Sequence, residues 1–173
     1  MTDFYRIDDL LTAEERAVRN RVRTWARERI MPRAAEFWER GEFQADRVSE
    51  LGELGIAGGT IGAYGCPKVS ATAYGLASQE LAYAVSAFTT CFGVHSGLAM
   101  GSIARFGTEE QKERWLPSMA TGEIIGAFAL TEPEHGSDAA HLETTATPVD
   151  DGYLINGGKR WIGNGDNFGV AVL

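Results

Sequence analysis

A change of hydrophobic pattern at Gly122 limits the folds open to this chain of 173 residues more than any other feature. Before Gly122, apolar residues recur at the spacing of amphipathic helices. After it, β-branched and aromatic residues form short runs separated by turn dipeptides, which is typical of strands and hairpins. We therefore expect an α+β chain, with an all-α helical bundle in residues 1–121 and the start of an antiparallel β domain in residues 122–173.

Start and stop signals divide the first part into helices. Capping boxes at Thr12–Glu15 and Thr108–Gln111 each predict a helix start, because their side chains satisfy free backbone N–H groups. Pro32 is expected to bend or end the first helix, since proline lacks an N–H, and Pro117 and Gly122 are expected to end the last. Between these limits the sequence predicts helices over residues 46–54, 70–84 and 86–106.

The second part is short for an independent β structure. Asp151-Gly152 and Asn156-Gly157 predict hairpin turns, because these residues tolerate positive φ. The apolar run FGVAVL then ends at Leu173. A piece of two to four strands cannot cover both of its faces, and exposed apolar edges favour aggregation. We therefore expect a truncated β domain that is either incomplete or packs against something else.

Charge and composition exclude several classes of function. The chain has 24 acidic and 16 basic residues, a net charge of −8, which is unsuited to nucleic acid or to an anionic membrane surface. Cys66 and Cys91 show no disulfide or metal spacing, so we expect buried thiols in a reducing compartment. Neither a signal-peptide pattern nor a membrane-spanning run occurs in the sequence, which indicates a cytoplasmic protein.

The loop ALTEPEHGSD, residues 129–138, combines polar side chains and flexible backbone directly after an apolar run. A metal site is disfavoured, because the spacing of His135 and His141 suits neither a helix face nor a strand face. Ser137 lacks a nucleophile elbow, which disfavours a hydrolase. An ordinary turn explains the Pro and Gly but not the clustered hydroxyls and carboxylate. The remaining interpretation is a loop whose N–H groups and hydroxyls surround an anionic ligand.

A second cluster, KRWIGNG, places Trp161 beside the permissive backbone of Gly163. A tryptophan next to a glycine lets a flat ring stack while the backbone reaches its edge. The alternative is that Trp161 only fills the core. Because both clusters fall in one small sheet, they could line the same flat cofactor.

Together these segments resemble a known family. GAFALTEPEHGSD followed by INGGKRWIGNG resembles the flavin-binding signature of the acyl-CoA dehydrogenases, and the helical first part matches in order. YGCPKVSATAYG and FGTEEQKERWLPSMATGE further resemble the glutaryl-CoA dehydrogenase and short-chain acyl-CoA oxidase branch. The resemblance implies an FAD-dependent oxidation of an acyl-CoA thioester to the trans-2-enoyl-CoA, with fatty acid metabolism as its setting.

The resemblance also implies roles for individual residues. The residues expected to bind FAD are Phe128, Leu130, Thr131, Gly136, Ser137, Trp161, Ile162 and Gly163. The residues expected to bind substrate are Ser137, Thr89, Thr90, His95 and Ser96. A buried structural role for His95 is the favoured alternative to a chemical one.

Two positions depart from the family pattern. The resemblance implies that glutaryl-CoA dehydrogenases carry an Arg where Thr89 stands, which argues against a dicarboxylyl substrate here. Many members carry Thr where Gly163 stands, so a hydroxyl donor to the flavin is lost. A glycine there also resembles the acyl-CoA oxidases, so dehydrogenase and oxidase both remain open.

No residue is expected to act as the catalytic base. The family's base glutamate lies on a C-terminal helical domain outside these residues, and Glu132 belongs to the flavin loop. Residues 1–173 alone are therefore expected to be inactive.

The expected partners are an acyl-CoA, an electron-transfer flavoprotein or oxygen as acceptor, and identical subunits in a homotetramer at full length. A non-catalytic remnant that binds acyl-CoA or a partner chain is the alternative from another class, and a structural α+β domain without a ligand is the simplest.

Overall fold

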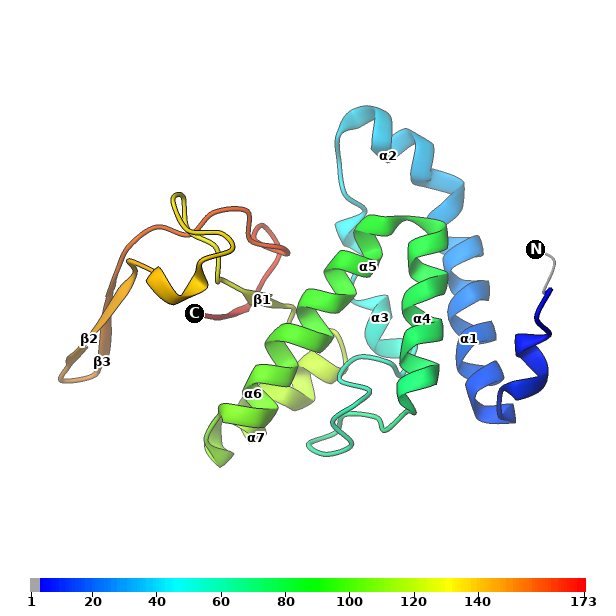
Figure 1. Cartoon of the computed structure of the whole chain (residues 1–173), viewed down its shortest axis with the longest axis horizontal. Helices are drawn as coiled ribbons and strands as arrows, with labels where there is room; N and C mark the ends of the chain where they lie inside the picture. The colour runs from blue at the N-terminus through cyan, green and yellow to red at the C-terminus, as the bar shows by residue number, and fades with distance from the viewer. Residues whose placement is uncertain (1–3) are drawn as a thin grey trace.

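A layer of helices forms most of the molecule, and a small β lobe lies at one end of it (Figure 1). The computed structural model describes residues 4–173. The helices are α1 (Ala13–Trp25), α2 (Ala34–Arg40), α3 (Glu50–Glu53), α4 (Ala71–Ala84), α5 (Ser86–Phe92), α6 (Met100–Phe106) and α7 (Glu109–Ala120). Short 3-10 turns occur at Ile7–Leu10, Met31–Arg33, Ala45–Arg47 and Ala139–His141, and π segments at Ala26–Ile30 and Gly93–Ala99. The strands are β1 (Gly126–Phe128), β2 (Thr145–Val149), β3 (Gly152–Asn156) and β4 (Val170–Val172).

Both predicted capping boxes are confirmed. At the start of α1, Glu15 N–H donates to Thr12 Oγ1 over 3.2 Å and Thr12 N–H donates to Glu15 Oε2 over 2.9 Å. Thr108 and Gln111 make the same reciprocal pair at the start of α7, over 3.2 and 2.9 Å. Each box satisfies two of the N–H groups that a helix start leaves free.

Neither proline ends its helix. At Pro32 the helical path tightens into a 3-10 turn and continues as α2, which ends at Gly41 with φ +65°. Pro117 lies inside α7, which runs on to Ala120. A proline removes only its own N–H bond, and burial of neighbouring residues of α7 offsets that loss. The stop at Gly122, which has φ +76°, is confirmed.

The helix predicted over residues 86–106 is one continuous path through α5, the π segment and α6. In the π segment the Met100 N–H donates to the carbonyl of His95, five residues earlier. Such wide turns often occur at functional sites. The helix predicted over residues 46–54 is broken into a 3-10 turn and α3.

Two apolar clusters hold the helices together. One lies between α1, α4 and α5 and contains the fully buried Val22, Leu81 and Phe92. The other joins α6 and α7 to the glycine-rich connection before α4 and contains Met100 and Leu116. Both cysteines are buried as expected, and burial raises the pKa of Cys66 to about 11 and that of Cys91 to about 12.

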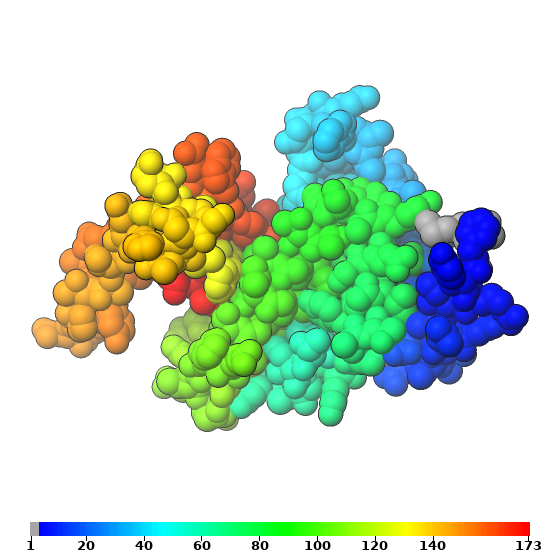
Figure 2. Space-filling model, viewed as in Figure 1, coloured from blue at the N-terminus to red at the C-terminus, as the bar shows by residue number. Residues whose placement is uncertain are grey.

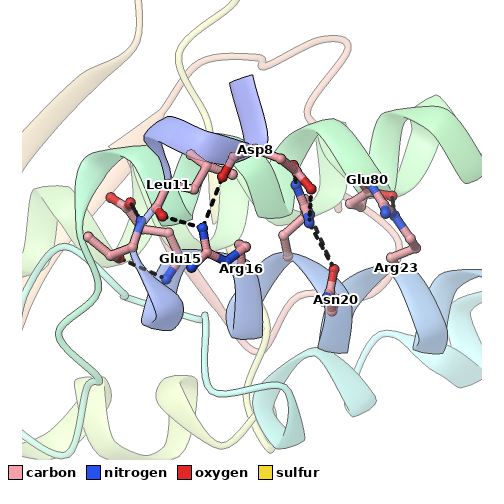
Figure 3. Close-up of polar contacts among 9 residues, drawn as sticks. Asp8, Leu11, Glu15, Arg16, Asn20, Arg23 and Glu80 are labelled. Atoms are coloured by element: carbon pink, nitrogen blue, oxygen red, sulfur yellow. Dashed lines mark hydrogen bonds and ion pairs between the residues drawn. The ribbon is translucent and has the colours of Figure 1, made fainter. Parts of the chain in front are cut away.

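A row of arginines on α1 ties this helix to its neighbours (Figure 3). Arg16 donates to the main-chain carbonyls of Asp8 and Leu11. Arg23 makes a two-pronged pair with the buried carboxylate of Glu80 on α4, over 2.7 and 3.0 Å. This pair raises the pKa of Arg23 and fixes how α1 and α4 lie against each other.

The β lobe is partly antiparallel and partly parallel. β2 and β3 form the predicted antiparallel hairpin at Asp151-Gly152. β1 pairs with β4 in parallel, with Gly126 opposite Val170, which corrects the expectation of a purely antiparallel piece. The pairing is parallel because the chain between β1 and β4 contains the whole hairpin and returns to the same end of the strand.

The second predicted hairpin, at Asn156-Gly157, is wrong. After Gly157 the chain turns back, and Arg160 N–H donates to the carbonyl of Thr131 over 2.9 Å. Gly157 has φ +150°, and a Cβ there would lie 2.4 Å from Thr144 Oγ1. The glycine is therefore required by close packing against Thr144 and not by a tight turn.

The β2–β3 hairpin projects from the rest of the molecule at the left of Figure 2. Both of its faces are exposed, including the apolar Tyr153, Leu154 and Ile155. The expectation that so small a β piece leaves its faces uncovered is confirmed. Among residues 4–173, no helix combines the length and apolar character needed to cross a bilayer.

Candidate functional site

The β lobe is fixed to the long helical path through both polar groups of Gly126. Its N–H donates to Nδ1 of His95 over 3.0 Å, and its carbonyl accepts from the side-chain amide of Asn164 over 3.0 Å. The same amide donates to the carbonyl of Cys91 on α5 over 3.1 Å. Nε2 of His95 lies 3.0 Å from the carbonyl of Met119 on α7. We refer to these five residues as the Gly126 junction.

Glycine is required at the centre of this junction. A Cβ at Gly126 would lie 2.5 Å from Cε of Met119 and 2.6 Å from Cβ of Ala99. The first residue of β1 therefore rests directly on the π segment, where no side chain has room. Such close contact lets one strand residue bond both to His95 in the π segment and to Asn164 in the loop before β4.

The junction also defines the state of His95. Because Nδ1 accepts from Gly126, the ring proton lies on Nε2 and is donated to Met119. The ring is 1% exposed, and desolvation lowers the pKa of His95. Both ring nitrogens are used within the protein, so His95 has a positioning role here. Contact of His95 with substrate stays a prediction.

The other residues expected to bind substrate lie along the same helical path. Ser96 is buried, and its hydroxyl accepts from Gly58 N–H over 2.8 Å. Thr89 donates to the carbonyl of Ser78 over 3.3 Å, and Thr90 is exposed on the next position of α5. Thr90 is thus the member of this group that presents its side chain to the surface.

Glu132 joins the two signature segments. Its carboxylate accepts from Lys159 Nζ over 2.8 Å and from the N–H groups of Glu143 and Thr144 over 2.6 and 3.0 Å. Lys159 also donates to the carbonyl of Leu130 over 3.0 Å. These contacts, Lys159 first, lower the pKa of Glu132 to about 2, so the carboxylate is held as an anion. We call Glu132 and its bonded groups the Glu132 anchor.

His135 of the polar loop lies between two carboxylates, one of them in the loop itself. Nδ1 of His135 lies 3.0 Å from Asp138 Oδ2, and Nε2 lies 3.6 Å from Glu143 Oε1. The contact with Asp138 raises the pKa of His135 and lowers that of Asp138. Within residues 4–173, no three histidine, cysteine, aspartate or glutamate side chains are grouped to hold a metal. Of these two contacts, the one with Asp138 lies within the loop and the one with Glu143 joins it to the chain beyond.

An apolar face lies beside the Glu132 anchor. Leu130 is 38% exposed and Trp161 is 80% exposed, although both are large apolar residues. They lie on segments joined by the bond from Arg160 N–H to the carbonyl of Thr131. The Arg160 guanidinium lies 4.5 Å from the centre of the Trp161 ring. Trp161 therefore does not fill the core of these residues, as the alternative interpretation requires.

The backbone around Trp161 is unusual. Trp161 and Asn164 both have positive φ, +59° and +64°, which side chains other than glycine seldom adopt. A Cβ at Gly163 would lie 2.9 Å from Cγ2 of Val94 in the π segment. The loop is thus pressed against the helix at a glycine. A side chain larger than hydrogen at residue 163 requires Val94 to move.

A cleft of about 350 Å³ separates α5 from this loop. Thr90, expected to bind substrate, and Ile162, expected to bind flavin, both line it. The full lining is Phe43, Ala87, Thr90, Cys91, Ile162, Asn164, Gly165, Asp166 and Asn167. We call it the helix–loop cleft.

Three of the remaining predicted residues lie apart from this cleft. Phe128 lines a different groove, together with Phe106 and Leu173. Gly136 and Ser137 are exposed in the polar loop, and a Cβ at Gly136 would contact nothing within 4 Å. Their contacts with FAD stay predictions.

Sequence reasoning missed the residues that join the segments, above all Asn164, Lys159 and the structural part played by Glu132. The signal for Asn164 in the sequence is its place directly after Gly163, because a polar residue beside a glycine can lie close to another backbone. An acid and a lysine in the two signatures could have suggested the Glu132 anchor, although neither signal identifies the partner.

Two family models match the chain. The model of the acyl-CoA dehydrogenase N-terminal domain matches residues 12–123, and the model of the middle domain matches residues 127–173. The chain belongs to the acyl-CoA dehydrogenase family.

Individual relatives agree with the family models. An acyl-CoA dehydrogenase of Bacillus subtilis is 39% identical over 157 residues, which is 90% of this chain and 41% of that protein. A crystal structure of glutaryl-CoA dehydrogenase from Mycobacterium smegmatis is 46% identical with a TM-score of 0.92, covering 96% of this chain and 43% of the other. A second M. smegmatis glutaryl-CoA dehydrogenase, in complex with FADH2, is 38% identical with a TM-score of 0.93, covering 98% and 44%.

These comparisons confirm the family resemblance, the fold and the family's use of FAD. The chain spans about two fifths of the length of the three relatives.

We predict that His95→Leu destabilises the protein, whereas His95→Gln does not. Leucine leaves Gly126 N–H and the Met119 carbonyl unpaired, at about 1–3 kcal/mol for each group. Glutamine can donate to Met119 and accept from Gly126 as His95 does. Urea unfolding of the full-length protein measures both variants. Equal stability of His95→Leu and wild type would contradict the structural role.

The same pair predicts a pH effect. The pKa of His95 lies below its ordinary 6.5 in the folded protein. An unfolded chain therefore takes up this proton at higher pH, and His95 contributes stability above about pH 6.5 that is lost as the pH falls toward the folded pKa. His95→Gln should reduce this loss of stability at low pH, measured by urea unfolding at a series of pH values. An equal loss in the variant and in wild type would contradict the prediction.

A further prediction concerns the Glu132 anchor. Lys159→Met should lower the melting temperature and weaken FAD retention, because it leaves the buried Glu132 carboxylate without its cation. In wild type the anchor contributes stability above about pH 4.5, which is lost as the pH falls toward 2, and the variant should show a smaller loss. Lys112→Met, which breaks the pair with the exposed Glu109 carboxylate on α7, is the matched control. Equal effects of both substitutions would contradict a special role for Lys159.

Proposed function

We propose that this chain forms part of an FAD-dependent acyl-CoA dehydrogenase that converts an acyl-CoA thioester to the trans-2-enoyl-CoA. The observation that carries the proposal is the exposed apolar face of Leu130 and Trp161 beside a cleft that α5 lines. Large apolar side chains grouped at the surface indicate a binding site. Family membership supports FAD as the group that covers them.

The residues present fit a flat cofactor. The apolar face suits the ring system, while Thr131 and Ser137 offer hydroxyls within the same signature. Gly136 faces open space, since an added Cβ would contact nothing within 4 Å, so its backbone is open to a ligand. Leu130, Thr131, Trp161 and Gly163 would then hold the ring, and Gly136 and Ser137 the phosphate region.

When bound, FAD supplies the acceptor for the hydride that leaves the β-carbon of the thioester. The chain's own residues bind and orient. The Gly126 junction fixes the Trp161 loop against α5, and the Glu132 anchor fixes the polar loop against Lys159. Thr90 on α5 and Ile162 on the loop form opposite walls of the cleft proposed for the acyl group.

Removal of the α-proton requires a base that we do not assign to these residues. Glu132 is unsuited to the task, because its carboxylate accepts three hydrogen bonds and its pKa is about 2. We propose that the base is a glutamate outside residues 1–173, as the resemblance implies.

Two further features of the proposal concern substrate and acceptor. Thr89 carries no charge and is bonded to Ser78, which favours a monocarboxylyl thioester over a dicarboxylyl one. An electron-transfer flavoprotein is the proposed acceptor, and a homotetramer in the cytoplasm is the proposed state. The second candidate is an acyl-CoA oxidase, favoured by Gly163, which offers no hydroxyl to the flavin.

Flavin content and turnover test the proposal. We expect the full-length protein to purify with FAD and to oxidise butyryl-CoA with an artificial electron acceptor in the absence of air. Residues 1–173 alone should neither retain FAD nor turn over, because the proposed base and the helices that complete the flavin site lie outside them.

Peroxide release under air, without another acceptor, would identify an oxidase. A full-length protein that holds no flavin would contradict both candidates. Stoichiometric flavin and turnover in residues 1–173 would contradict the expected inactivity.

A further inference from the structure

Phe43 lies between two neighbouring clefts. It lines the helix–loop cleft and also a second cleft of about 380 Å³ that lies against α2. Ala87, at the start of α5, is the other residue shared by both. The second cleft, which we call the α2 cleft, is lined by Ala34, Ala35, Phe37, Trp38, Glu42, Phe43, Gln44, Ala84, Val85, Ser86, Ala87 and Phe88.

The position of Phe43 is fixed from two sides. Its ring centre lies 4.9 Å from that of the fully buried Phe88, with the planes tilted by 43°. The next residue, Gln44, is buried and donates from Nε2 to the carbonyl of Ile30 over 3.2 Å. The segment between α2 and α3 is thus held beside the start of α5 (Figure 1). Phe43 is therefore a partly buried, packed residue in the wall of both clefts.

The chemistry of the two clefts differs. The loop wall of the helix–loop cleft is mostly polar, from Asn164 to Asn167. The opposite wall is mostly apolar, with Thr90 as its polar member. The α2 cleft is mainly apolar, with alanines and aromatic rings on both walls. An alkyl chain that passes Phe43 would therefore gain burial against a mainly apolar lining in the α2 cleft.

We propose that Phe43 is a specificity-determining residue whose ring separates the two clefts and limits the length of the acyl chain. The inference rests on the proposed function, because it takes the helix–loop cleft as the acyl site. A short acyl chain ends against the Phe43 ring. A longer chain needs the α2 cleft, which becomes continuous with the acyl site when the ring is removed.

The test is the chain-length profile of the full-length, FAD-loaded protein. We compare kcat/KM for butyryl-, hexanoyl-, octanoyl- and decanoyl-CoA in wild type, Phe43→Ala and the milder Phe43→Leu. Phe43→Ala should shift the optimum to longer chains, by about fourfold for each further methylene that becomes buried. Dissociation constants of non-oxidisable 3-thia-acyl-CoA analogues should shift in the same direction, which separates binding from turnover.

Two more variants make the outcome specific. Ala87→Leu adds bulk at the other shared residue and should shift the profile toward butyryl-CoA. Ala35→Phe, which fills the α2 cleft, should cancel the gain when it is combined with Phe43→Ala. Tyr83→Ala, at an exposed aromatic residue on α4 that lines neither cleft, is the matched control.

The outcomes separate this inference from the proposed function. If wild type oxidises the thioesters and both Phe43 variants keep its profile, or if Ala35→Phe does not cancel the gain, the inference is overturned. If wild type neither binds nor oxidises any thioester, the proposed function fails and the inference fails with it. If Phe43→Ala does not fold, Phe43→Leu and Ala87→Leu must still shift the profile in opposite directions.

Discussion

The close contact of Gly126 with the helical path is the constraint on which the rest of the site depends. A strand residue without a side chain rests on Ala99 and Met119, and its two backbone groups are used by His95 and Asn164. These bonds are buried or partly buried, so leaving either group without a partner would cost more than the bond contributes. The junction therefore allows one arrangement of β1, α5 and the Trp161 loop.

The Glu132 anchor fixes the polar loop in the same way as the Gly126 junction fixes the Trp161 loop. Because Lys159 satisfies both the Glu132 carboxylate and the Leu130 carbonyl, the two signature segments are held together by one side chain. The polar groups at the centre of the site are thus largely paired within the protein. Leu130 and Trp161 remain exposed, which is an arrangement suited to an apolar ring.

Local signals in the sequence predicted the helices well, because capping boxes and apolar spacing act over a few residues. Thr12–Glu15 and Thr108–Gln111 are examples. Long-range contacts could not be predicted in this way. The parallel pairing of β1 with β4, and the bond from Asn164 to Cys91, join residues far apart in the chain. Gly157 is the clearest example. The dipeptide Asn156-Gly157 predicts a turn, but the glycine is needed for close packing against Thr144, and the sequence alone does not distinguish the two reasons.

The most direct test of the account is the affinity of the full-length apoprotein for FAD, measured by flavin fluorescence for wild type and Asn164→Asp. Aspartate tolerates the positive φ of residue 164 but cannot donate to the carbonyls of Cys91 and Gly126. We expect wild type to bind FAD and the variant to bind it about tenfold or more weakly, with its helices intact. Equal affinity of the two proteins would show that the Gly126 junction does not position the flavin site.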